Sequence, residues 1–144
     1  MFNSQYLGTR KPSAVAYRDI GATTALDGAS PHKLVSLLYV ALASEIAAAR
    51  GAIARHDIAE KGRAISHAVR ILEEGLIAPL NMEAGGALAV NLRDLYVYMV
   101  QRLTLANLKG DERMLGECSG LIGSLREGWE GIADQVRAAD QVAA

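Results

Sequence analysis

Residues 85–111, GGALAVNLRDLYVYMVQRLTLANLKGD, decide the fold of this 144-residue chain. A glycine pair opens the stretch and Gly110-Asp111 closes it, so one long helix is predicted between these two breaks. Apolar side chains recur at steps of three and four residues, which places them on one stripe of that helix. The stripe consists of Leu88, Leu92, Leu95, Tyr96, Met99, Leu103 and Ala106. A stripe of this length needs other helices to cover it.

Further helices are predicted on both sides of this stretch. Ser30-Pro31 supplies an N-cap and a proline at the first helical position, so a helix begins there. Asp57, with Glu60 three residues later, predicts the start of the next helix, which ends before Pro79. The last helix follows Asp111 and has the most regular apolar spacing. Its stripe consists of Leu115, Cys118, Ile122, Leu125, Trp129, Ile132 and Val136.

The short connections predict an all-α fold, an antiparallel up-down four-helix bundle. We expect the bundle to span residues 30–137 and residues 138–144 to form a frayed C-terminal tail. Residues 1–29 contain Gly8, Pro12, Gly21 and Gly28, so they are expected to be a flexible N-terminal tail that holds at most a short capping helix.

The composition restricts the compartment and the partners. Fifteen Lys and Arg against sixteen Asp and Glu give a net charge of −1, without the basic footprint of a nucleic-acid-binding protein. The single cysteine, Cys118, cannot form an internal disulfide and fits a reducing compartment. No run approaches the roughly 18 apolar residues of a membrane span, and the N-terminus lacks a signal peptide's apolar region. We therefore expect a cytoplasmic protein without membrane insertion.

No catalytic site can be assembled from the residues that usually carry chemistry. His32, His56 and His67 lack the spacing of a metal-ligand pair and are expected to face solvent. Cys118 lies on a core stripe, so its thiol is expected to be buried and inert. Gly85-Gly86 is not followed by the Lys and Ser or Thr of a phosphate loop. The sequence predicts no enzyme activity, no metal site and no cofactor.

Several motifs resemble those of the flagellar secretion chaperone family of the FliS type. In the central stretch they are the glycine pair, Asn91, Leu95-Tyr96 with Tyr98-Met99, and Leu103 with Ala106-Asn107. ASPHKLVSLLY, residues 29–39, resembles the family's first-helix signature. The family usually continues with Asp-Gly, where this chain has Val40-Ala41. The resemblance extends from about Tyr17 to Trp129.

The resemblance implies a non-enzymatic chaperone that binds the disordered C-terminal segment of flagellin one to one. Such a complex prevents premature polymerisation and delivers flagellin to the flagellar type III secretion apparatus. The family also has links to export-gate components and to regulators of flagellar genes. It further implies that Tyr17 and Ile20 belong to a lid that folds over the client surface when no client is bound; composition alone indicates a disordered tail. A different function remains open, that of a structural or adaptor protein that self-associates through its apolar surface.

Two surfaces are candidates for partner binding. Val90, Val97 and Leu108 lie opposite the core stripe of the central helix, and Val100 and Leu105 flank them. Leu37 and Ala41 widen the apolar arc of the first helix. We expect these residues to form a groove for an amphipathic partner helix, unless other helices enclose the central one. In the last helix, Gly116, Gly120 and Gly123 lie opposite the apolar stripe, where a partner backbone could approach closely, although small residues also accumulate on uncritical faces.

Overall fold

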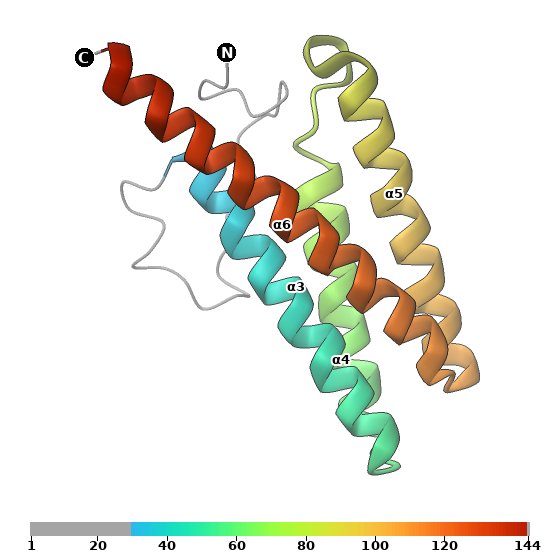
Figure 1. Cartoon of the computed structure of the whole chain (residues 1–144). Coiled ribbons are helices and arrows are strands. Elements are labelled where there is room, and N and C mark those ends of the chain that lie inside the picture. Colours follow the sequence, from blue (N-terminus) through green and yellow to red (C-terminus); the bar gives the residue numbers. More distant parts are fainter. Residues whose placement is uncertain (1–29, 144) are drawn as a thin grey trace.

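The described part of the chain consists of helices joined by short turns. The computed structural model describes residues 30–143, with side chains to Ile132. The helices are α3 (Pro31–Ala54), α4 (Ile58–Arg70), the π-helical η1 (Ile71–Ile77), α5 (Met82–Lys109) and α6 (Glu112–Ala143). Between residues 30 and 143 no strand interrupts them, which confirms the all-α prediction for this range (Figure 1). Tyr17 and Ile20 lie outside the described residues.

The helix ends follow the predicted capping chemistry. The Ser30 hydroxyl accepts a hydrogen bond from the Lys33 amide at 3.1 Å. The Asp57 carboxylate accepts one from the Glu60 amide, also at 3.1 Å. Gly110 ends α5 in the left-handed conformation, with φ 63°. The last helix differs from the prediction, since it continues to Ala143 although fraying was expected beyond residue 137; its alanine-rich end favours helix.

The glycine pair marks a break within α5. Asn81 caps the first turn by accepting hydrogen bonds from the amides of Glu83 and Ala84, both at 3.1 Å. Gly86 then has φ 58° and ψ −142°, a conformation open essentially to glycine alone. The long regular part of α5 therefore begins after Gly86, as the glycine pair predicted.

The core lies where these helices meet. α3 packs against α4 and α6, whereas α5 packs against α6, α4 and η1. Figure 1 shows the chain running down α3, back along α4 and η1, down α5 and back along α6. Each fully buried aliphatic side chain contributes about 1.5–3 kcal/mol. The largest buried side chains include Leu38, Leu42, Ile46, Ile65, Leu72, Leu76, Tyr96, Met99, Leu103 and Leu115.

Cys118 is fully buried in this core, as the sequence predicted. Burial raises the pKa of its thiol to about 11, so the thiol stays protonated at neutral pH. A protonated, inaccessible thiol is a poor nucleophile, which agrees with the inert role expected for this residue.

The apolar character of α3 exceeds the expectation from the sequence. By length and composition α3 could cross a membrane, contrary to the prediction that no stretch qualifies. Its apolar side chains have partners in the fold, since Leu38, Leu42 and Ile46 are buried in the core. A helix that packs against two neighbours needs a wide apolar arc, and this accounts for the composition of α3.

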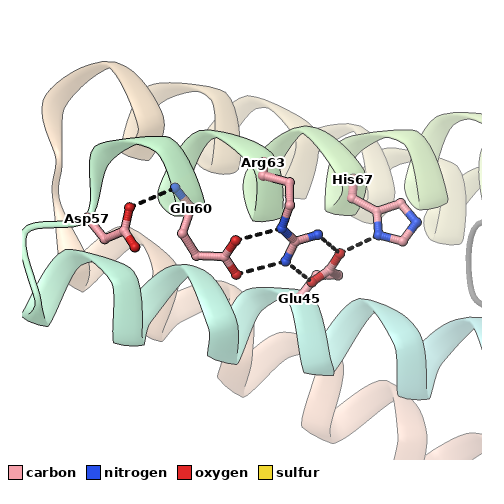
Figure 2. A network of polar contacts seen from close by, with 5 residues as sticks. All are labelled: Glu45, Asp57, Glu60, Arg63 and His67. Atoms are coloured by element: carbon pink, nitrogen blue, oxygen red, sulfur yellow. Dashed lines mark hydrogen bonds and ion pairs between the residues drawn. The ribbon is translucent and has the colours of Figure 1, made fainter.

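A polar network joins α3 to α4 (Figure 2). The Arg63 guanidinium donates to both carboxylate oxygens of Glu45, at 2.9 and 3.0 Å, and its Nε donates to Glu60 at 2.7 Å. His67 Nδ1 contacts the same Glu45 carboxylate, so His67 is partly buried and does not face solvent as predicted. Burial raises the pKa of Glu45, but the bonds from Arg63 and His67 outweigh it and lower the pKa below its usual value.

Candidate functional site: an apolar groove between α5 and α6

An apolar groove of about 290 Å³ opens between the first half of α5 and the middle of α6. Leu88, Leu92 and Leu95 form its α5 wall. Leu121, Leu125 and Ile132 form the α6 wall, with Ser124 and Gly128 beside them. Tyr39 of α3 and Trp129 of α6 complete the lining. We call this site the α5–α6 groove.

The α5 wall consists of residues that the sequence placed in the core. Leu88 is 46% exposed, and Leu92 and Leu95 are only partly buried. The lower part of the same stripe behaves as predicted, since Tyr96, Met99 and Leu103 are fully buried. The stripe is therefore continuous along α5, but among the described residues no neighbouring helix fully covers its first half. Clustered apolar surface of this kind marks an interaction site.

Trp129 is held in the groove by His32 at the start of α3. The two rings stack with centroids 4.5 Å apart and 5° between their planes. His32 Nε2–H donates to the Trp129 carbonyl at 2.8 Å, and Trp129 Nε1–H donates to the His32 carbonyl at 3.0 Å. The prediction that His32 faces solvent is therefore wrong. The stack and the paired bonds fix the orientation of the indole and of the α6 segment that carries it.

Tyr39 links the groove to the core. Its ring meets Trp129 edge to face, with centroids 6.2 Å apart. Its hydroxyl forms a 2.6 Å hydrogen bond with the Tyr96 hydroxyl, and both tyrosines are buried. This bond connects α3 with α5, two helices that do not pack closely against each other elsewhere. The base of the groove is thus tied to three helices.

Farther along α5, polar side chains at the surface also join this helix to α6. The Tyr98 hydroxyl donates to Glu117 at 2.6 Å, and Arg102 Nε donates to the other oxygen of the same carboxylate at 2.7 Å. The hydrogen bond from Tyr98, assisted by Arg102, lowers the pKa of Glu117. These contacts fix α5 against α6 beside the α5–α6 groove.

The glycines of α6 are placed differently with respect to the groove. Only Gly128 lines it. A methyl group added at Gly120 or Gly123 would meet nothing within 4 Å, so these two positions are open. Gly116 lies beside Arg50 of α3, whose Nη2 is 3.7 Å from the position of an added methyl. The structure therefore does not bring Gly116, Gly120 and Gly123 into the α5–α6 groove.

The other predicted binding residues also lie outside this groove. Val90 and Leu108 are exposed, at 41% and 81%. Val97, Val100 and Leu105 are partly buried, and Val100 packs against the core. The remaining two, Leu37 and Ala41, belong to α3, which is not a close neighbour of α5. These residues are not brought together into one groove, and their role in binding stays a prediction.

Comparison with known proteins identifies the family. The family model described as "Flagellar protein FliS" matches residues 13–136. The chain belongs to the FliS family. The flagellar secretion chaperone FliS of Salmonella typhimurium is 38% identical over 118 residues, which cover 82% of this chain and 87% of the Salmonella protein. The motifs of α3 and α5 thus predicted the family correctly.

Two further FliS relatives show similar coverage. The flagellar secretion chaperone FliSB of Pseudomonas aeruginosa is 40% identical over 117 residues, 81% of this chain and 92% of its own length. The flagellar secretion chaperone FliS of Vibrio cholerae is 33% identical over 120 residues, 83% of this chain and 88% of its own length. The similarity therefore includes most of each FliS protein and is not limited to one motif.

Proposed function

We propose that this FliS-family chain is a cytoplasmic, non-enzymatic export chaperone that binds the disordered C-terminal segment of flagellin in the α5–α6 groove. The groove itself is the observation that supports the proposal. Leu88, Leu92 and Leu95 follow the spacing of a helical face, so an amphipathic client helix can lie along them and bury its own apolar side chains. The relatives are flagellar secretion chaperones, which agrees with a protein that holds a client before export.

Binding in this groove accounts for both parts of the proposed role. The apolar residues of the client would be covered by the chaperone and thus withheld from contacts with other flagellin subunits. No covalent step is needed, because burial of apolar surface drives the association and the ordering of the client opposes it. This opposition keeps the one-to-one complex reversible, so that the client can be released at the flagellar type III secretion apparatus.

We further infer that the four helices form the antiparallel up-down bundle predicted from the short connections. The packing of each helix against its sequence neighbours and of α3 against α6 supports this topology. In such a bundle α5 lies diagonally opposite α3, which agrees with the small contact between them. One half of α5 can then be left uncovered without disturbing the core below it.

Calorimetric titration with a flagellin C-terminal peptide tests the proposal. Leu88→Asp should weaken binding at least about tenfold, because it removes about 1.5–3 kcal/mol of apolar burial and introduces a charge. Val90→Asp is a matched control, since Val90 has a similar exposure, 41% against 46%, but lies outside the groove. Both variants should fold, and their melting curves would verify this.

The peptide affinities of these two variants show whether the client binds in the α5–α6 groove or on the outer face of α5. Weaker binding by Val90→Asp alone would place the client on the outer face of α5 predicted from the sequence. Unchanged binding by both would remove α5 from the client site. A wild-type dimer that Leu88→Asp converts to a monomer, without any affinity for flagellin peptides, would instead establish the self-associating adaptor.

A further inference from the structure

Ser124 of α6 brings a hydroxyl group to the otherwise apolar α5–α6 groove. The two other lining residues with a polar side-chain group use that group inside the fold. The Tyr39 hydroxyl bonds to the Tyr96 hydroxyl at 2.6 Å, and Trp129 Nε1–H donates to the His32 carbonyl at 3.0 Å. Among the residues whose side chains the structure describes, none forms a hydrogen bond with the Ser124 hydroxyl. Since Ser124 is exposed, water can satisfy this hydroxyl in the free protein.

A hydroxyl on a helix can also bond to the backbone of its own helix. Thr104 of α5 does so, because its hydroxyl donates to the Val100 carbonyl at 2.8 Å. Ser124 has no corresponding bond to the Gly120 carbonyl within the described structure. Its hydroxyl is therefore available on the groove wall.

The groove around Ser124 lets a partner come close to this hydroxyl. Leu121 and Leu125 lie beside Ser124 on the α6 wall, and Gly128 follows one turn later without a side chain. A methyl group added at Gly128 would meet nothing within 4 Å, so the space there is open. A client helix that lies in this groove removes water from the Ser124 hydroxyl. A hydroxyl that is buried without a partner weakens binding by roughly the energy of a hydrogen bond.

We infer that Ser124 selects the register of the client helix by requiring a hydrogen-bonding side chain opposite it. This role rests on the client binding in the α5–α6 groove, as proposed above. The client residue is a serine, threonine, asparagine or glutamine, and its neighbours on the same face are apolar. If the client moved by one turn, an apolar side chain would cover the hydroxyl, and the polar one would meet leucine. One polar group in an apolar site thus gives the site its specificity.

Three substitutions of Ser124, studied by calorimetric titration of the full chain with a flagellin C-terminal peptide, test this role. Ser124→Ala should raise the Kd about tenfold, because the client's polar group is then buried without a partner. Ser124→Thr keeps the hydroxyl and should bind nearly as well as the wild type. Ser124→Val has the shape of the threonine variant without its hydroxyl, so it should bind about as weakly as Ser124→Ala. The comparison of threonine with valine therefore isolates the hydroxyl from the size of the side chain.

The matched control and the peptide identify the partner of Ser124. Ser119→Ala should leave the affinity unchanged, because Ser119 is a serine of α6 that does not line the groove. In the peptide, each serine, threonine, asparagine and glutamine is replaced in turn by alanine. One replacement should weaken binding to the wild type about tenfold and binding to Ser124→Ala much less, which is the coupling expected of a bonded pair.

Unchanged or tighter binding by Ser124→Ala and Ser124→Val would overturn this role, since the hydroxyl would then need no partner from the client. The absence of a coupled position in the peptide would also overturn it. Leu88→Asp distinguishes this failure from a failure of the proposed function. If Leu88→Asp weakens binding, the client still lies in the groove and only the role of Ser124 is wrong. If Leu88→Asp and the Ser124 variants all bind normally, or if the wild type does not bind the peptide, both proposals are wrong.

Discussion

His32 and Trp129 are 97 residues apart in the sequence, yet each donates a hydrogen bond to the other's backbone carbonyl while their rings stack. The pair fastens the middle of α6 to the start of α3. Trp129 also lines the α5–α6 groove, so the same contact that supports the fold sets the position of one groove wall. Stability and client binding are therefore expected to be coupled through this pair.

His32→Ala should lower the free energy of unfolding by about 1–3 kcal/mol, the sum of one ring stack and one hydrogen bond. It should also weaken binding of the flagellin peptide, because the indole loses its fixed orientation. Urea denaturation and calorimetry measure the two effects. Lys33→Ala, at an exposed neighbouring position, should change neither. Normal affinity in a destabilised His32→Ala protein would show that the pair serves the fold alone.

The sequence predicted the helices and the family well, because both depend on local patterns. Caps at Ser30 and Asp57 and the break at Gly110 fix helix ends through neighbouring residues. The groove could not be predicted in this way. Apolar spacing shows which side of α5 is apolar, but it does not show how far along that side α6 remains in contact. The spacing therefore predicts that Leu88 and Leu92 lie in the core, although both line the groove.

The partial burial of His32 and His67 could not be predicted from the sequence for a related reason. His32 and His67 are partly buried because of partners on another helix, Trp129 and Glu45, and no local pattern identifies such partners. The resemblance to the family's first-helix signature did include His32, and this was the one available sign that its side chain has a fixed place. The exposed outer face of α5 was assigned correctly for Val90 and Leu108, but exposure alone does not make a groove.

Glu45 should make the stability of the bundle depend on acid pH. Its pKa in the folded protein lies below its usual value, so its ionised form stabilises the fold above about pH 4.5. That contribution is lost as the pH falls through the lowered pKa and the carboxylate becomes protonated. Glu45→Gln should cost about 1–2 kcal/mol at pH 7 and should reduce the loss of stability between about pH 5 and pH 3.

Urea denaturation at several pH values measures this dependence. Glu74→Gln is a suitable control, because Glu74 forms a more exposed i, i+4 pair with Arg70 where α4 continues into η1. It should cost at most about 0.5 kcal/mol. If the free energy of unfolding falls equally at acid pH in the wild type and in Glu45→Gln, the network in Figure 2 is not the cause of the pH dependence.

Deletion of residues 1–20 tests the lid implied by the family resemblance. If Tyr17 and Ile20 cover the client surface in the free protein, the tail competes with the client, and its removal should tighten peptide binding. A tethered segment acts at an effective concentration in about the millimolar range, so even a weak contact is measurable. Tyr17→Ala with Ile20→Ala should reproduce the effect in the full-length chain. Weaker binding after deletion would make the tail a part of the binding site.

Substitutions at the glycines of α6 test whether the client contacts the groove alone or also the outer face of α6. Gly120→Ala with Gly123→Ala should stabilise the protein by about 1–2 kcal/mol through helix propensity, because the added methyls meet no neighbour within 4 Å. Since neither residue lines the groove, the affinity for the flagellin peptide should not change. Gly128→Leu, in contrast, places a bulky side chain at the groove and should weaken binding. Weaker binding by the double alanine variant would mean that the client also crosses the outer face of α6, where the sequence predicted close approach of a partner backbone.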